Sequence, residues 1–286
     1  MKISIITTTY NCEKYIEETV ESVLSQRGEF EIEYFLIDAK STDSTLEKIN
    51  KFKQKVEDGH YAQYNNGIVM KVLSEPDKGM YDGISKGLKQ LTGDVVAYIN
   101  GDDFYLPNAF SCVCEIFEKF PQVNWLTGRA NDYNAKGQSW QSILPAHYHK
   151  EYITKGFYGL SLPVIQQEST FWRIELLDKI NLDEFRSKKL AGDFYLWHSF
   201  SKNNQLYILN SNLGGFRFSE GQKSADLESY HREFSEITNN YKPTFIEKLV
   251  IAHIKKTRRL SDKRKLKRNP NIIRFDFQKS EWSLGK

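Results

Sequence analysis

Apolar positions in the first hundred residues alternate between two kinds of spacing. Short apolar runs typical of buried strands begin at Ile3, Tyr34, Ile68 and Val95. Between these runs, apolar residues recur at every third or fourth position, as on one face of a helix. Strand and helix in alternation, with short connections, predict an α/β fold with a mostly parallel central sheet and helices on both of its faces.

The same spacing places the first helices. We expect helices over residues 16–24, 80–91 and 107–120. Another helix follows Asp38, where Ser44 and Glu47 have the spacing of a capping box.

The second half of the chain has less regular spacing. Tyr195, Leu196, Trp197 and Phe200 follow Asp193 in a pattern that predicts a helix over 190–201. From about Leu227 the pattern is helical as far as Asn269-Pro270, which ends it. The expected strands of this half are 123–127, 139–144, 169–172, 206–209 and 215–218.

Polar residues follow each of the first four strands at its carboxyl end. These groups are Thr7–Tyr10, Asp38, Glu75–Lys78 and the pair Asp102-Asp103. Ligands of parallel α/β sheets bind beyond the carboxyl ends of the strands, so four loops are expected to deliver polar groups to one rim.

The pair Asp102-Asp103 points to a cation. Adjacent carboxylates repel each other unless a cation or hydrogen-bond donors compensate. Oxygen ligands of this kind suit Mg²⁺ or Mn²⁺, which keep substrate phosphates as further partners. The alternative is a solvated acidic turn.

Glycine-rich phosphate loops are missing from the sequence. The first strand is followed by Thr-Thr-Thr-Tyr-Asn rather than Gly-x-Gly-x-x-Gly, and no Gly-x-x-x-x-Gly-Lys-Ser/Thr occurs. A diphosphate would therefore be held by a metal and by basic side chains such as Lys78.

Composition indicates a globular chain without an apolar run long enough to span a bilayer. No secretory signal is visible at the start, and the cysteines Cys12, Cys112 and Cys114 have no metal-ligand spacing. We expect a cytoplasmic protein with reduced thiols.

Charge is divided unevenly along the chain. The net charge is +3, but residues 242–268 alone carry +9, which leaves the rest at −6. Apolar residues alternate with cations over Lys248–Arg268. This pattern is compatible with two interpretations: peripheral docking on an anionic membrane, or a helix that packs its apolar side on the body and leaves its cations in solvent. Nucleic-acid binding is disfavoured, because the body is acidic and no nucleic-acid motif occurs.

Four stretches together resemble the family 2 inverting glycosyltransferases, which have a GT-A fold. They are SIITTTYNCEKYIEETVESVLSQ, FLIDAKSTDSTLEKI, LSEPDKGMYDGISKGLKQLTGDVVAYINGDDFYLPNAF and QQESTFWRIELLDKI…LAGDFYLWHSF. The resemblance is dense to about residue 120, returns over 163–200 and is absent from the C-terminal tail. It implies a glycosyltransferase domain over 1–225, with a nucleotide-sugar-binding half (1–104), an acceptor half (105–225) and a helical basic extension over 226–286.

The resemblance also implies a role for single residues. Asp103 and Asp102 match the motif that holds the metal and diphosphate, with Mg²⁺ or Mn²⁺ as cofactor. Asp193 matches the general base, although an N-cap of its helix is the structural alternative. Donor-binding positions are matched by Thr8, Tyr10, Asp38, Asp77, Lys78, Asp82 and Lys86. The structural alternatives are that Asp38 is only an acid at the end of a strand, and that Lys78 and Lys86 are solvated lysines without contact to the donor.

Three positions depart from the family pattern. Ala39 replaces a second acid or Gly, Gly101 replaces Ser, and Gln167-Glu168 stands where His-Gln is common. The Gln-x-x-Arg-Trp signature of processive relatives is missing, which favours transfer of a single sugar from a nucleotide donor to a glycan or glycolipid hydroxyl, with inversion. The implied setting is bacterial surface polysaccharide synthesis. Alternatives are a sugar-nucleotide nucleotidyltransferase and a non-catalytic glycan- or nucleotide-binding module.

Overall fold

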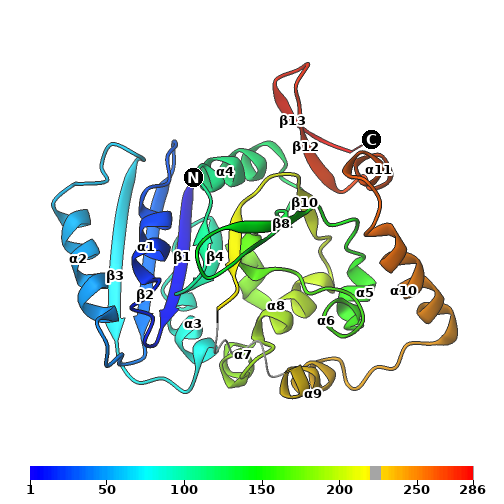
Figure 1. Ribbon diagram of the computed structural model, residues 1–286, viewed down its shortest axis with the longest axis horizontal. Helices are drawn as coiled ribbons and strands as arrows, with labels where there is room; N and C mark the ends of the chain where they lie inside the picture. The colour runs from blue at the N-terminus through cyan, green and yellow to red at the C-terminus, as the bar shows by residue number, and fades with distance from the viewer. Residues whose placement is uncertain (220–226, 286) are drawn as a thin grey trace.

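A nine-stranded sheet runs through the centre of the computed structural model, which describes residues 1–219 and 227–285 (Figure 1). Its strand order is β13-β12-β10-β6-β9-β4-β1-β2-β3. Most neighbouring strands are parallel; β9 is antiparallel to β4 and β6, and β13 to β12. The predicted α/β class and mostly parallel sheet are confirmed.

The first half of the chain follows the predicted alternation. The strands are β1 (Lys2–Thr9), β2 (Glu31–Asp38), β3 (Gly67–Ser74) and β4 (Val95–Asn100). The helices are α1 (Ile16–Leu24), α2 (Thr45–Glu57), α3 (Met80–Leu88) and α4 (Ala109–Lys119). Each predicted element of this half is present, with its ends moved by a few residues.

The register of these strands aligns their carboxyl ends. Thr9 pairs with Asp38, and Asp38 pairs with Ser74. On the other side of β1, Thr8 pairs with Asn100, the last residue of β4. The loops that follow the four strands therefore start from one edge of the sheet.

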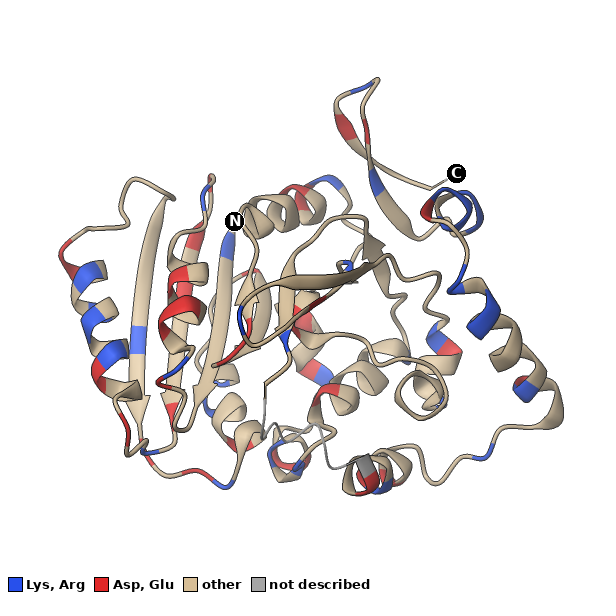
Figure 2. Ribbon diagram, viewed as in Figure 1, with Lys and Arg blue, Asp and Glu red and all other residues tan. Residues whose placement is uncertain are grey.

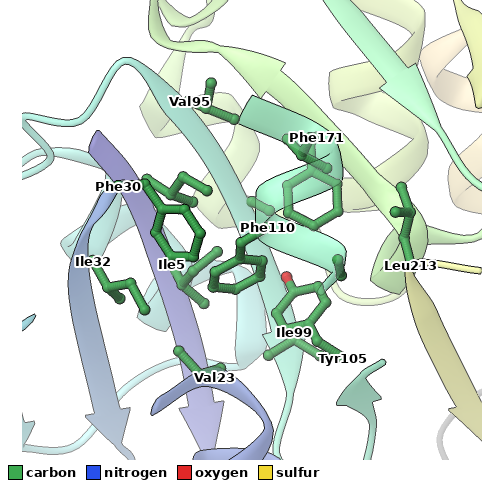
Figure 3. Close-up of a cluster of buried hydrophobic side chains, with 14 of the residues drawn as sticks. Ile5, Val23, Phe30, Ile32, Val95, Ile99, Tyr105, Phe110, Phe171 and Leu213 are labelled. Atoms are coloured by element: carbon green, nitrogen blue, oxygen red, sulfur yellow. The ribbon is translucent and has the colours of Figure 1, made fainter. Parts of the chain in front are cut away.

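Two apolar cores cover the two faces of the sheet. On one face, alternate strand residues such as Ile5 and Ile99 pack against α1, α2 and α4, with Phe110 near Phe30 and Phe171 (Figure 3). On the other face, Ile6 and its neighbours pack against α3, α8 and the aromatic residues of the second half. Burial on both faces explains why these strands are nearly continuous apolar runs.

The second half adds short elements and a second, four-stranded sheet in the order β5-β11-β7-β8. Its helical segments are α5 (Lys150–Thr154), α6 (Phe157–Leu160), η1 (Gln167–Ser169), η2 (Ile174–Lys179), α7 (Leu182–Ser187) and α8 (Gly192–Ser201). Its strands are β5 (Phe104–Tyr105), β6 (Trp125–Thr127), β7 (Ala130–Tyr133), β8 (Ser139–Ile143), β9 (Thr170–Arg173), β10 (Tyr207–Leu209) and β11 (Gly214–Arg217). The predicted strands of this half are all present.

The predicted capping box at α2 is wrong. Ser44 is the N-cap residue, but its side chain does not cap the helix. Its hydroxyl donates to a Glu13 carboxylate oxygen at 2.7 Å, and Glu47 pairs with Lys51 instead. A charged acceptor from another loop therefore replaces the local cap. A complete capping box is present at Thr244 and Glu247.

The basic extension is helical only in part. Its helices are α9 (Leu227–Ile237), α10 (Phe245–Thr257) and α11 (Asp262–Arg268). An unpredicted hairpin of β12 (Ile272–Asp276) and β13 (Glu281–Leu284) then joins the central sheet beside β10. The expected boundary between residues 225 and 226 lies outside the described residues.

Cations gather on α10 and α11 at one end of the molecule (Figure 2). The first turns of α10 also expose Phe245, Ile246 and Leu249, whereas Ile251 and Ile254 are buried. The apolar stripe predicted for this helix is thus divided between the protein body and solvent. Across residues 1–219 and 227–285, no helix has both the length and the apolar character needed to cross a bilayer.

Candidate functional site

A cleft of about 1180 Å³ lies at the carboxyl rim of the sheet. Loops after β1, β3 and β4 line it together with the segment 164–168, the start of α8 and parts of β7, β11 and α9. Five of the predicted site residues line this cleft: Thr8, Tyr10, Asp77, Asp102 and Asp193. Five others do not line it: Asp38, Lys78, Asp82, Lys86 and Asp103.

The loop after β1 brings Thr8 and Tyr10 to one wall of the cleft. Tyr10 is 61% exposed, so its ring is open to a ligand. The next residue, Asn11, has φ 51° and accepts a hydrogen bond from the Thr42 backbone N–H at 2.9 Å. This left-handed position turns the chain sharply away from the strand and leaves Tyr10 on the rim.

Asp38 lies beneath the rim and is fully buried. Its carboxylate accepts hydrogen bonds from the Thr9 hydroxyl (3.1 Å), the Ser74 hydroxyl (2.8 Å), and the backbone N–H and hydroxyl of Ser41 (3.1 and 2.5 Å). The neighbouring residue Ala39 lines the cleft. These hydrogen bonds link the ends of β1, β2 and β3. Asp38 therefore has the structural role of an acid at the end of a strand.

The stretch after β3 contributes Asp77 to the cleft. The charged side chains of Asp82 and Lys86 bind neighbouring protein groups instead of lining the cleft. Asp82 is buried and pairs with Arg186 at 2.9 Å, while it also accepts the Lys78 backbone N–H at 3.0 Å. Burial favours a higher pKa for Asp82, but these partners hold the pKa below its usual value. Lys86 pairs with Glu75 at 2.8 Å. A different lysine, Lys189, lines the cleft and donates to the Lys78 carbonyl at 3.1 Å.

Asp102 and Asp103 occupy different environments. Asp102 lines the cleft, whereas Asp103 is 1% exposed. Asp103 accepts hydrogen bonds from the Arg217 backbone N–H at 2.8 Å and from the Asn100 side chain at 3.2 Å. Burial, and then the charge of Asp102, raise the pKa of Asp103 well above its usual range. Asp102 is therefore the member of the pair placed to meet a ligand.

Arg217 is a buried cation that sequence reasoning missed. Its Nε donates to the Asp102 carbonyl at 2.9 Å, and its terminal nitrogen pairs with Glu18 at 2.5 Å. The guanidinium also lies over the rings of Tyr15 and Phe104. These contacts fix the turn that carries Asp102, and only a contact between residues far apart in sequence could reveal them.

Glu168 is a buried acid in the wall of the cleft. It is 3% exposed, and within the described part of the chain its Oε1 has no hydrogen-bond partner. Burial, followed by the charge of Asp103, raises the pKa of Glu168 well above its usual range. An unsatisfied buried carboxyl oxygen at a cleft needs either a proton or a ligand. The sequence marked this position only as a departure from the family pattern.

The acidic groups of the cleft fit a divalent cation that is shared with a ligand. Among the described residues, no group of three or more His, Cys, Asp or Glu side chains could hold a metal by itself. Mg²⁺ and ions like it are commonly bound through one or two carboxylates, with substrate phosphates and water as the other ligands. Asp102 and the unsatisfied oxygen of Glu168, both in the lining of this cleft, suit that kind of site.

Asp193 enters the cleft from the first turn of α8. The N-cap residue of α8 is Ala191, so the alternative role of Asp193 as N-cap is wrong. Its carboxylate accepts the Phe194 backbone N–H at 2.7 Å. Burial is the main cause that raises the pKa of Asp193 to about 7, and the charge of Glu233 adds to the increase. A carboxylate with this pKa can exchange a proton near neutral pH.

Helix α9 supports the start of α8, which the sequence did not indicate. The Glu233 carboxylate accepts the backbone N–H groups of Lys189, Leu190 and Ala191 at 2.7, 2.8 and 2.6 Å. The next residue, Phe234, stacks on Phe194 with ring centroids 3.4 Å apart. Glu233 therefore fixes the segment that leads into the helix carrying Asp193, up to the N-cap residue Ala191, and no described side chain caps the helix itself.

Known proteins similar to this chain point to one family. The profile described as "Glycosyl transferase family 2" matches residues 4–180. An uncharacterized glycosyltransferase of Mycoplasma genitalium is 25% identical over 277 residues, which cover 93% of this chain and 88% of that protein. The putative glycosyltransferase EpsE of Bacillus subtilis is 31% identical over 118 residues, or 41% of this chain and 39% of EpsE. The match to an uncharacterized glycosyltransferase of Nostoc covers only 33% of that relative.

Solved structures share the fold at low sequence identity. S. aureus TarS 1–349 in complex with UDP-GlcNAc is 19% identical, with a TM-score of 0.61 over 90% of this chain and 72% of the TarS chain. The mannosyltransferase PcManGT of Pyrobaculum calidifontis, in complex with GDP-Man and Mn²⁺, is 14% identical, with a TM-score of 0.54 over 92% of this chain and 71% of that one. These likenesses agree with the expected GT-A fold.

Proposed function

The chain belongs to glycosyl transferase family 2, and from this premise we propose that it transfers a single sugar from a nucleotide-diphosphate donor to a hydroxyl of a glycan or glycolipid, with inversion. One observation carries the proposal. Asp102 and Asp193, which are far apart in sequence, line the same cleft at the carboxyl rim of the sheet. Residues 1–104 would bind most of the nucleotide, and residues 105–225 would bind the acceptor.

The donor would lie along the loops after β1, β3 and β4. Tyr10 offers an exposed ring for stacking of the base, and Asp77 and Lys189 offer polar contacts to the ribose or the sugar. Asp102 would supply a ligand for Mg²⁺ or Mn²⁺, with Asp103 buried behind it. A cation bound there would neutralise the charge that develops on the departing diphosphate.

Asp193 would take the proton of the acceptor hydroxyl as that oxygen attacks the anomeric carbon. A general base works best when its pKa lies near the working pH, and a pKa of about 7 meets that condition. Three backbone N–H groups held by Glu233 fix the turn before Asp193, so the carboxylate is oriented before the substrate binds.

We further propose that the protein works in the cytoplasm, at the inner membrane face, in synthesis of a bacterial surface polysaccharide. The support is the exposed apolar group of Phe245, Ile246 and Leu249 beside Lys248 on α10. Apolar residues that enter the headgroup region and cations that meet anionic lipids are the features of a peripheral helix. Co-sedimentation with anionic vesicles, but not with neutral ones, is expected; equal behaviour of the two would exclude this docking.

A thermal-shift screen of nucleoside diphosphates, with and without Mn²⁺, tests the donor assignment. A ligand that binds the native state raises the melting temperature by mass action. We expect one base to stabilise the protein and Mn²⁺ to increase the effect. No stabilisation by any base in the presence of Mn²⁺ would contradict the assignment.

Two other activities remain as competing hypotheses. A nucleotidyltransferase would form a sugar nucleotide from a nucleoside triphosphate and a sugar phosphate, so incubation with these substrates distinguishes it from a transferase. A non-catalytic module would retain ligand binding and show no turnover in the wild type or in Asp193→Asn. Transfer of sugar by the wild type that is lost in Asp193→Asn would exclude both.

A further inference from the structure

A second hollow, of about 350 Å³, lies between the C-terminal end of α10 and the segment that leads to the cleft. Lys255, Arg258 and Arg259 line it on one side. Ile143, Ser161 and Pro163 line it on the other. No carboxylate is among its lining residues, so the hollow presents three cations and one hydroxyl to whatever enters it.

Among the described residues, these three cations have no carboxylate partner. Within residues 1–219 and 227–285, no salt bridge involves Lys255, Arg258 or Arg259. The nearby acid Asp262 pairs with Arg129 at 2.9 Å and with Lys265 at 3.6 Å. The C-terminal end of α10 and the following α11 therefore carry an excess of positive charge (Figure 2).

Helix electrostatics explain only part of this arrangement. Cations at the last turn of a helix interact favourably with its carbonyl groups, which would account for Lys255 and Arg258 along the axis of α10. That effect does not require three cations to converge on one hollow.

One segment of chain lines both the hollow and the cleft. Ser161 and Pro163 line the hollow, and the following residues Val164–Glu168 line the cleft. On the other side, Ile143 of β8 pairs with Ala130 of β7, two residues from Asp132 in the cleft wall. Consecutive Cα atoms are about 3.8 Å apart. A molecule bound in the hollow is therefore separated from the cleft by a distance of only a few residues along the chain.

We propose that this hollow binds a phosphate group of the acceptor and anchors it while the reacting hydroxyl enters the cleft. Guanidinium groups bind phosphate oxygens through paired N–H donors, and a lysine adds a point charge. The space beyond the phosphate would accommodate part of the attached sugar or polyol. This inference rests on the proposed transferase function, because it names the chemical class of the acceptor.

Calorimetric titration with glycerol 3-phosphate tests the proposal on the whole 286-residue chain. The variant Arg258→Gln/Arg259→Gln removes two cations of the hollow. The control Lys263→Gln/Arg264→Gln removes two exposed cations of the neighbouring helix α11, which do not line the hollow. We expect the first variant to bind at least about tenfold more weakly than the wild type, and the control to bind as the wild type does. Equal binding by all three proteins, or no binding by the wild type, would overturn the proposal.

Two further measurements separate the possible sources of phosphate and the possible causes of failure. Flotation with phosphatidylglycerol vesicles that depends on Arg258 and Arg259, and not on Lys263 and Arg264, would assign the phosphate to a lipid headgroup. Glycerol 3-phosphate binding without flotation would assign it to a soluble acceptor. UDP is titrated in parallel: if UDP fails to bind while glycerol 3-phosphate binds, the donor assignment fails and the phosphate site stands.

Discussion

The two walls of the cleft are built in different ways. The wall formed by the loops after β1, β3 and β4 depends on strand register, with Asp38 joining the neighbouring strand ends. The wall that carries Asp193 depends on contacts between helices α8 and α9, through Glu233 and Phe234. The first wall is positioned by backbone pairing within the sheet. The second is positioned by a few side chains, so single substitutions there should misplace the chemistry without unfolding the sheet.

Replacement of Asp193 tests the chemical role of the second wall and should have the largest effect. Asp193→Asn keeps the size of the side chain but cannot accept the proton. Loss of a general base typically lowers kcat by about 10²–10⁴-fold. Donor affinity should stay unchanged, as measured by calorimetry. Asp183→Asn, at a side chain that is 86% exposed, is the control and should keep full activity.

Replacement of Asp38 tests the first wall. Asp38→Ala leaves the hydroxyls of Thr9, Ser41 and Ser74 without their charged acceptor beneath the rim. We expect a loss of about 2–3 kcal/mol in the free energy of unfolding, measured by urea denaturation, together with weaker nucleotide binding. A variant with normal stability but no nucleotide binding would instead indicate that Asp38 contacts the nucleotide directly.

Replacement of Glu233 tests how the second wall is held. Glu233→Gln keeps the shape but weakens the acceptor of three backbone N–H groups, so we expect a loss of about 1–2 kcal/mol in stability. Because the charge of Glu233 raises the pKa of Asp193, the acidic limb of the pH–kcat profile should also move to lower pH. Glu236→Gln, an exposed acid on the same helix, should change neither quantity. A loss of stability with an unmoved limb would assign Glu233 a purely structural role.

The pH profile of the wild type tests the environment of Asp193. Burial raises the pKa of this group to about 7, and only its deprotonated form can accept a proton. The rate should therefore fall by about tenfold for each pH unit well below that pKa, and level off above it. An acidic limb near pH 4 would mean that Asp193 is solvated like an ordinary aspartate in the working enzyme.

The smallest effect is expected for Lys86. Its ammonium pairs with Glu75, whose side chain is 46% exposed, and does not line the cleft. Lys86→Gln should cost less than about 1 kcal/mol of stability and leave donor affinity unchanged. A clear loss of nucleotide affinity, measured beside the wild type, would restore the donor-binding role that the family resemblance implies.

Most of the first wall could be predicted from sequence, but of the second wall only Asp193 and its helix could. Apolar runs and helical spacing located β1 to β4, and their parallel arrangement brought Thr8, Tyr10 and Asp102 to one rim. These features depend on local pattern and on a general rule for parallel sheets. The pattern did not show that Asp103 would be buried while Asp102 faces the cleft, because Arg217, which is distant in sequence, binds the Asp103 carboxylate and the Asp102 backbone carbonyl.

Errors elsewhere have the same physical origin. The predicted capping box at α2 is absent because the Ser44 hydroxyl donates its hydrogen bond to Glu13, a residue of another loop. The hairpin β12–β13 was missed because its short strands are stabilised by pairing with β10, and its sequence follows a long helical and basic segment. Glu233 gave no local signal, and Glu168 gave only a departure from the family pattern. Each acquires its place through tertiary contacts, which apolar spacing does not encode.

A crystal structure with UDP and Mn²⁺ bound tests the central claim most directly. It should show the ion coordinated by Asp102 and by diphosphate oxygens, with the base near Tyr10 and the Asp193 carboxylate facing the open space beyond the diphosphate. A nucleotide bound away from this rim, or an ion held by groups other than Asp102, would contradict the account.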